Sequence, residues 1–259
     1  MTIAQISQLI ETVAPLAYQE HYDNAGLCVG NAAAEVTGIL LCLDVSELVV
    51  EEAVALGCNL IISHHPVIFS GLKQLTGQNA TQRIVQQAIQ HNIALYAAHT
   101  NLDKIRGGVS EKMCEKLHLT DRKILEQADA SEIGLGMIGN LSHAVDSRQF
   151  MMNVKQIFGN TYLRYNANYT PRAISRVAVC GGSGASLMHS ALRQDADAFI
   201  TADLKYHDLQ GAEPRLLCID VGHYESEIFT LEIFLDILNK NTTFAVHISK
   251  QGKNAVNYI

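Results

Sequence analysis

Apolar runs of strand length alternate with amphipathic segments along most of the chain. The first amphipathic segment, 3–13, follows Thr2 and places Ile6 and Ile10 on one face, so it predicts a helix that Pro15 ends. Alternation of strands with helices is typical of an α/β sheet. Buried strands are predicted at 38–44, 58–63, 93–98, 174–180, 198–201 and 216–221. Helices are predicted at 46–57, 81–91, 108–117, 147–158 and 223–238, and a last short strand at 244–248.

The middle of the chain, 127–170, has a weaker pattern, with a strand near 136–141, the helix from Ser147 and a strand-like run at 162–165. Both halves of the chain share a rhythm of strand, polar loop and helix. This rhythm indicates a duplicated motif, although no residue-level repeat accompanies it.

Composition places the chain among globular proteins. Hydrophobic residues make up 48% and charged residues 17% of its 259 residues. No apolar run approaches the roughly 20 residues that span a bilayer, and residues 1–5 lack the basic start of a secretory signal. We therefore expect a cytoplasmic protein with no membrane partner.

Charge and cysteine usage narrow the function classes. A net charge of −7 disfavours an extended nucleic-acid surface, which needs clustered Lys and Arg. It leaves room for a nucleotide-sized substrate, because metal ions can supply positive charge locally. The six cysteines form no CxxC pair, which argues against a disulfide framework. Buried thiols are expected at Cys42, Cys58, Cys180 and Cys218.

Metal-type ligands follow three of the predicted elements. They are His64 with His65, His99 with Asp103, and His223 with Glu227 at i and i+4 of a helix. Ligands gather at the carboxyl ends of strands in open α/β sheets. Imidazoles and carboxylates without thiolates favour a hydrolytic or Lewis-acid site for Zn, Mn, Fe or Co over a structural zinc site. A lone histidine at the end of a strand is more often a hydrogen-bonded residue than a metal ligand. Three such ligand pairs in one chain favour a metal site over chance.

Three other segments have two interpretations each. The run 181–184 (GGSG) either presents N–H groups to a phosphate or forms a tight turn, and the turn is favoured. The run 205–207 (KYH) either contacts substrate and moves protons or serves packing. Asp23 and Asn24 either orient a ligand loop or form an Asx turn, and again the turn is favoured.

Five segments in order along the chain resemble the Nif-three-like family, whose members are labelled GTP cyclohydrolase I type 2 homologues. The resemblance covers nearly the whole chain, and five ordered motifs make it specific. At 259 residues the chain resembles the short form, without an inserted domain. The segments are YDNAGL (22–27), ISHHP (62–66), HTNLD (99–103), TADLKYHD (201–208) and DVGHYESE (220–227).

The resemblance implies a dinuclear metal centre of two divalent ions. Carried over residue by residue, the ligands are His64, His65, Asp103, His223 and Glu227, with Glu227 bridging and His99 close by. It also implies a Nif-three-like fold of two intertwined α/β halves with mixed sheets, and a homohexamer. We expect one half at 1–126 with 223–259 and the other at 127–222.

Two functions remain open. The first is a metal-dependent hydrolase acting on a nucleotide or related small molecule, with His99 or His207 as general acid or base. The family label implies a GTP cyclohydrolase, although no segment of the sequence indicates recognition of guanine. The second is a non-catalytic metal-binding or regulatory scaffold. Both need the same ligands.

Overall fold

The computed structural model describes residues 1–128, 132–160 and 162–257. They form two compact units, each built on a mixed sheet. The first unit contains 1–102 and 230–255, and the second contains 103–229 with 256–257. Because the two segments of the first unit lie on either side of 103–229 in the chain, the two α/β halves are intertwined in sequence, which confirms the predicted fold class.

The first unit has a largely parallel sheet. Its strand order is β1-β4-β3-β2-β11, and only the edge strand β1 runs antiparallel to its neighbour β4. The four residues of β2, β3 and β4 are all buried, as strands covered on both faces require. The strands are β1 (Gly26–Val29), β2 (Ile39–Cys42), β3 (Leu60–Ser63), β4 (Ala94–Ala97) and β11 (Val246–Ile248).

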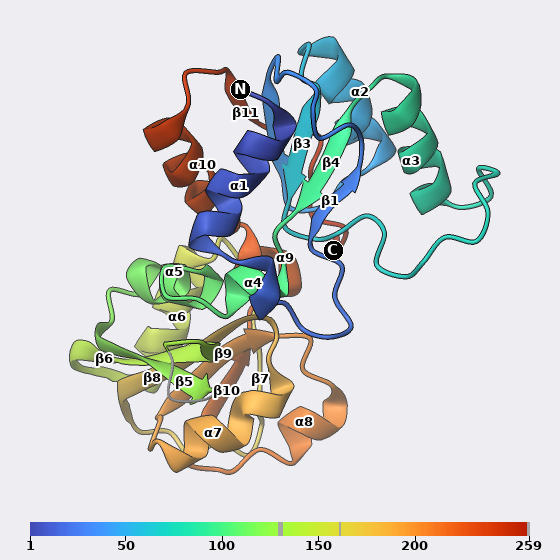
Figure 1. Ribbon diagram of the computed structural model, residues 1–259. Helices are drawn as coiled ribbons and strands as arrows, with labels where there is room; N and C mark the ends of the chain where they lie inside the picture. Colours follow the sequence, from blue (N-terminus) through green and yellow to red (C-terminus); the bar gives the residue numbers. More distant parts are fainter. Residues whose placement is uncertain (129–131, 161, 258–259) are drawn as a thin grey trace. The chain divides into compact units, whose positions relative to one another are not determined.

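Helices cover both faces of this sheet. One side carries α1 and α10, and the other carries α2 and α3 (Figure 1). Thr2 and Gln5 form a capping box at the start of α1, so the predicted helix 3–13 is confirmed. The helices of this unit are α1 (Ile3–Val13), α2 (Glu47–Ala55), α3 (Ala80–Gln90) and α10 (Thr230–Asn241), and the short α4 (Thr100–Asp103) crosses into the second unit.

The second unit has a sheet of order β5-β6-β8-β9-β10-β7. Its centre, β8-β9-β10, is parallel, and antiparallel strands flank it on both sides. The strands are β5 (Thr120–Gln127), β6 (Gly134–Asp146), β7 (Arg164–Tyr165), β8 (Ala173–Ser183), β9 (Ala198–Ala202) and β10 (Leu217–Asp220). The helices are α5 (Val109–Lys116), α6 (Ser147–Ile157), α7 (Met188–Arg193), α8 (Tyr206–Gln210) and α9 (His223–Glu227).

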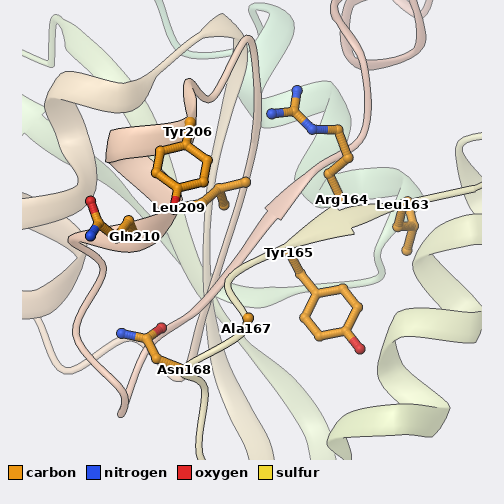
Figure 2. A pocket seen from close by; sticks show the side chains of 8 residues that line it. All are labelled: Leu163, Arg164, Tyr165, Ala167, Asn168, Tyr206, Leu209 and Gln210. Carbon is orange, nitrogen blue, oxygen red and sulfur yellow. The ribbon is translucent and has the colours of Figure 1, made fainter.

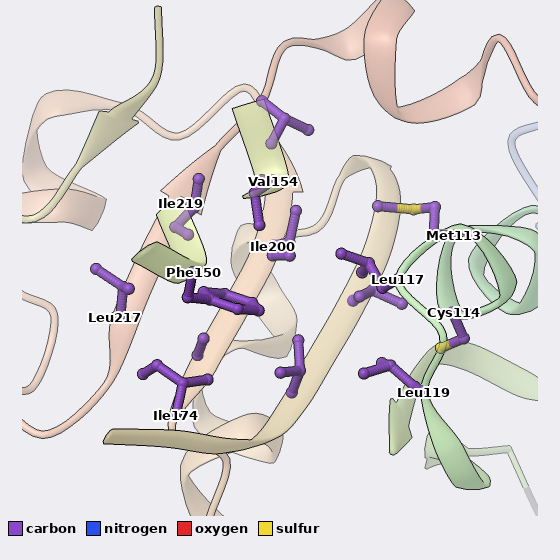
Figure 3. Packing of buried hydrophobic residues seen from close by; sticks show 14 of the residues in the cluster. Met113, Cys114, Leu117, Leu119, Phe150, Val154, Ile174, Ile200, Leu217 and Ile219 are labelled. Atoms are coloured by element: carbon purple, nitrogen blue, oxygen red, sulfur yellow. The ribbon is translucent and has the colours of Figure 1, made fainter. Parts of the chain in front are cut away.

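Two apolar cores hold this second sheet between its helices. One core packs α5 and α6 on one face and includes Met113, Phe150, Ile200 and Ile219 (Figure 3). The other packs α7 and α8 on the opposite face, around Phe199. Cys42, Cys58, Cys180 and Cys218 are buried free thiols, as expected.

The structure corrects the expected boundaries at 126/127 and 222/223. The contact boundaries lie at 102/103 and 229/230, because α5 and β5 pack on the second sheet and α9 packs on β8 and β9. The helix predicted at 223–238 is two helices, since Phe229 packs in the second unit's core while Phe234 is buried in the first unit. No helix in the described ranges is long and apolar enough to cross a membrane.

Candidate metal centre

Three histidines gather at one edge of the first unit's sheet. β3 and β4 are parallel neighbours with Ser63 opposite Ala97, so the residues after them emerge side by side. His64 and His65 follow β3, and His99 follows β4. Their ring centroids are 5.0 Å apart for His64–His65 and 5.3 Å for each pair with His99. One ring nitrogen from each lies within 4.8 Å of the others, a spacing that suits shared metal coordination.

Each of these imidazoles is held at Nδ1 by an oxygen that can only accept. His64 Nδ1 donates to the Ala98 carbonyl, His65 Nδ1 to Asp44 Oδ1 and His99 Nδ1 to Asp23 Oδ1, each at 2.8 Å. The proton of the neutral ring is therefore on Nδ1, and the lone pair is on Nε2. Metal-binding histidines are commonly oriented in this way by a carboxylate or carbonyl behind the ring.

Asp23 is a permanent anion behind His99. Burial acts to raise the pKa of Asp23, but hydrogen bonds from His99, from the Thr100 hydroxyl and from the Asn24 N–H outweigh it and hold the pKa well below its usual range. The Asx turn favoured from sequence does not form at Asp23, because Asp23 Oδ1 contacts the adjacent Asn24 N at 2.7 Å while the N–H two residues on, that of Ala25, donates to Gln19. Asp23 instead orients His99, which lies far from it in the chain.

The second unit carries a histidine–carboxylate pair on α9. His223 Nε2 lies 3.0 Å from Glu227 Oε2, as the i,i+4 spacing predicts. His223 Nδ1 lies 2.7 Å from Asp203 Oδ2, so this ring too has a carboxylate behind it. The hydrogen bond to Glu227 raises the pKa of His223 to about 9 against the effect of burial, and the charges of Glu227 and Asp203 act in the same direction.

The glycines of 181–184 make room for this pair. A Cβ on Gly182 would collide with the Glu227 carboxylate and approach His223 Cε1 at 3.3 Å. The N–H groups of Gly181, Gly182 and Gly184 donate to the hydroxyls of Ser110, Ser226 and Thr201. These N–H groups are therefore committed within the protein, which disfavours the phosphate interpretation. Instead of a loop turn, Gly181 to Ser183 are the last residues of β8.

Asp103 lies at the end of α4, in the same unit as Glu227. Burial raises the pKa of the Cys180 thiol, and the negative charges of Asp103 and Glu227 raise it further. Glu227 lies against Gly181 and Gly182 at the end of β8, and His223 is its partner there. Asp103 remains a predicted ligand.

His207 lies apart from these contacts. Its ring is exposed, and its Nδ1 is 3.2 Å from Gln210 Oε1 in the same helix, α8. Its neighbour Tyr206 lines a cavity of about 580 Å³ with Arg164 and Tyr165 (Figure 2). The KYH segment thus borders a cavity, while the candidate proton-transfer group His207 is not among the residues lining it.

The donor set of each unit fits divalent metal ions. The structure brings together His64, His65 and His99 in one unit, and His223 with Glu227 in the other. Sequence reasoning missed the residues behind the rings, Asp44 and Asp203, although each directly follows a buried strand or lies one residue beyond it. An acidic residue at such a strand end was the signal that could have found them.

Comparison with known proteins relates this chain to one family, by sequence and by structure. A family model described as Duf34/NIF3 (NGG1p interacting factor 3) matches residues 1–255. A Lactococcus lactis protein named GTP cyclohydrolase 1 type 2 homolog is 39% identical over 235 residues, 88% of each chain. A Clostridium perfringens protein of the same name is 32% identical over 265 aligned positions covering 100% of both. The crystal structure of Staphylococcus aureus hypothetical protein SA1388 has a TM-score of 0.91 at 29% identity, covering 100% of this chain and 99% of that one.

Proposed function

The chain belongs to the Duf34/NIF3 family, and from this premise we propose that it binds two divalent metal ions and hydrolyses a nucleotide or related small molecule. The proposed ligands are His64, His65, Asp103, His223 and Glu227. Zn, Mn, Fe and Co all suit imidazole with carboxylate.

One observation carries the proposal: each of four imidazoles has its Nδ1 engaged by an oxygen acceptor. His64, His65, His99 and His223 share this arrangement, and three of the four acceptors are carboxylates. Each of these rings turns Nε2 away from its acceptor, which suits metal coordination by His64, His65 and His223 and proton acceptance by His99.

The protein's own groups would share the chemistry with the ions. Divalent ions held by these residues would lower the pKa of a coordinated water towards neutrality and offset negative charge that develops during attack. His99, with Asp23 fixing its tautomer, accepts a proton at Nε2, and the anionic Asp23 stabilises the imidazolium that forms. Asp203 keeps the His223 ring directed at Glu227.

The substrate class rests on the relatives' names and on charge. Two relatives are named as homologues of a GTP cyclohydrolase. Hydrolytic opening of a purine imidazole ring needs an activated water, which a divalent metal site can supply. The chain itself carries a net charge of −7, so an anionic nucleotide needs positive charge supplied at the site. Two divalent ions would provide it.

The test is metal content measured together with turnover. Protein stripped by a chelator and reloaded with Zn, Mn, Fe(II) or Co is assayed by elemental analysis and by loss of the purine absorbance of GTP. Glu227→Ala should lose metal and turnover, while Glu225→Ala, in the same helix, should keep both. Full turnover in metal-free protein would overturn the hydrolase proposal.

Full metal loading without turnover on GTP or a wider nucleotide panel would favour the scaffold alternative. A homohexamer, implied by the family resemblance, belongs to the same proposal. Light scattering on the metal-loaded protein measures it directly, and a monomeric mass would contradict it.

A further inference from the structure

Two exposed aromatic rings lie beside the imidazole cluster of the first unit. Phe69 is 50% exposed, and its ring centroid lies 6.2 Å from that of His99 at an interplanar angle of 75°. Tyr22 is 54% exposed, and its ring lies 6.3 Å from Phe69. We call Tyr22 and Phe69 together the aromatic surface. It continues the line of rings that starts at His64 and passes through His99.

Side-chain hydrogen bonds fix the two loops that carry these rings. Asn24 Nδ2 donates to the Ile68 carbonyl at 2.6 Å, which joins the loop of Tyr22 to the loop of Phe69. Asp23, between Tyr22 and Asn24, holds His99 Nδ1. The same short segment therefore orients the candidate general base and positions both rings. A substrate held on the rings would lie beside His99.

Exposed aromatic faces are costly in water and bind other planar rings well. Aromatic groups stack or meet edge to face at centroid distances of about 4.5–7 Å. A nucleobase stacked on an aromatic side chain contributes about 1–3 kcal/mol, whichever base it is. Rings fixed in place before binding lose little conformational freedom when a ligand arrives.

We propose that Tyr22 and Phe69 bind the aromatic base of the substrate by stacking, and so select an aromatic heterocycle over an aliphatic or purely phosphorylated molecule. This inference rests on the proposed function, because it takes the imidazole cluster as the reacting site. It deepens that function by naming the residues that recognise the base. It also gives a site of imidazole and carboxylate ligands a means to distinguish a nucleotide from a phosphate ester that has no aromatic base.

The aromatic surface allows a direct test with two probes that share a triphosphate. Metal-reloaded protein is titrated by calorimetry with GTP and with inorganic triphosphate. Tyr22→Ala and Phe69→Leu should each weaken GTP binding about tenfold, the effect of one lost stacking contact. Both should bind triphosphate as the wild type does. Tyr22→Phe keeps the ring and should retain GTP affinity.

Tyr165→Ala is the matched control, because Tyr165 is a tyrosine of similar exposure, 48%, on β7 of the second unit. It should leave both affinities unchanged. Phe69→Leu keeps apolar volume, so its folding, checked by thermal melting, should stay close to the wild type.

Unchanged GTP affinity in Tyr22→Ala and Phe69→Leu would overturn the inference, as would an equal loss of triphosphate affinity. A change in oligomeric mass in these variants, with GTP affinity kept, would overturn it in favour of a contact between copies of the chain. Elemental analysis of the same samples distinguishes failure of this inference from failure of the proposed function. Wild-type protein that holds metal but binds no GTP overturns this inference alone, and protein that holds no metal overturns the proposed function and this inference with it.

Discussion

Asp203 accepts a hydrogen bond from His223 Nδ1 at 2.7 Å, and it does so from a backbone conformation with φ of +55°. This left-handed conformation is uncommon for residues other than glycine, although Asp and Asn tolerate it best. It directs the carboxylate from the end of β9 back towards α9.

Replacing Asp203 by Asn should weaken metal binding by about 10–100-fold, the usual effect of removing a carboxylate behind a ligating imidazole. Asn keeps the backbone conformation but is a weaker acceptor. The measurement is competition against a chelating indicator dye. Asp195→Asn is the control, since Asp195 has φ of +54° but pairs with Arg215 instead of a histidine. Equal metal affinity in Asp203→Asn and wild type would contradict the role assigned to Asp203.

Gly182→Ala should lower both the metal content of the protein and its free energy of unfolding. Gly182 has φ of +60° and lies against Glu227 and His223, so an added Cβ must displace the Glu227 carboxylate. Gly159→Ala isolates the backbone strain, because Gly159 has φ of +68° and nothing lies within 4 Å of an added Cβ. Gly182→Ala should be less stable than Gly159→Ala by about 1–3 kcal/mol, the usual cost of overpacking. Urea unfolding measures this difference, and only Gly182→Ala should lose metal.

The strands that position the ligands could be predicted from sequence because they are short, continuous apolar runs. β2, β3, β4, β9 and β10 are buried along their whole length, and histidines follow β3 directly and β4 after one residue. β5 could not be predicted, since Thr120–Gln127 is mostly exposed and charged and becomes a strand only by pairing with β6.

The hydrogen-bond partners of the imidazoles could not be predicted from sequence either. Asp23 precedes His99 by 76 positions, and Asp44 precedes His65 by 21. Only the order of strands in the sheet brings them together. The motifs containing His64, His65 and His99 therefore indicated the chemistry, whereas the tautomers that direct it required the tertiary structure.

His99 and His207 are both candidate proton-transfer groups, and their substitutions should have different effects on turnover. His99 is supported by Asp23 and lies in the imidazole cluster, while His207 is exposed and contacts Gln210. We expect His99→Ala to reduce kcat on GTP by about 10²–10⁴-fold, the range for a positioned acid or base. We expect His207→Ala to change kcat far less. Comparable losses in both variants would return His207 to the mechanism.

The stability of the first unit should depend on pH through Glu52. Its carboxylate, on α2, accepts hydrogen bonds from the Ser249 hydroxyl and from the N–H groups of Lys250 at 3.0 Å and Gln251 at 3.2 Å. Partial burial acts to raise the pKa of Glu52, but these hydrogen bonds and the charge of Lys250 together lower it. The segment after β11 is thereby tied to α2.

A carboxyl whose pKa is lowered by folding stabilises the fold above its unfolded pKa of about 4.5, and the contribution is lost as pH falls through the folded value. Glu52→Gln should therefore lower the melting temperature at pH 7, and the difference from wild type should shrink when both are melted near pH 4. Glu51→Gln, an exposed neighbour on the same helix, should follow the wild type at both values. A Glu52→Gln deficit that stayed constant across this range would mean that the segment is held by contacts other than the ionised carboxylate.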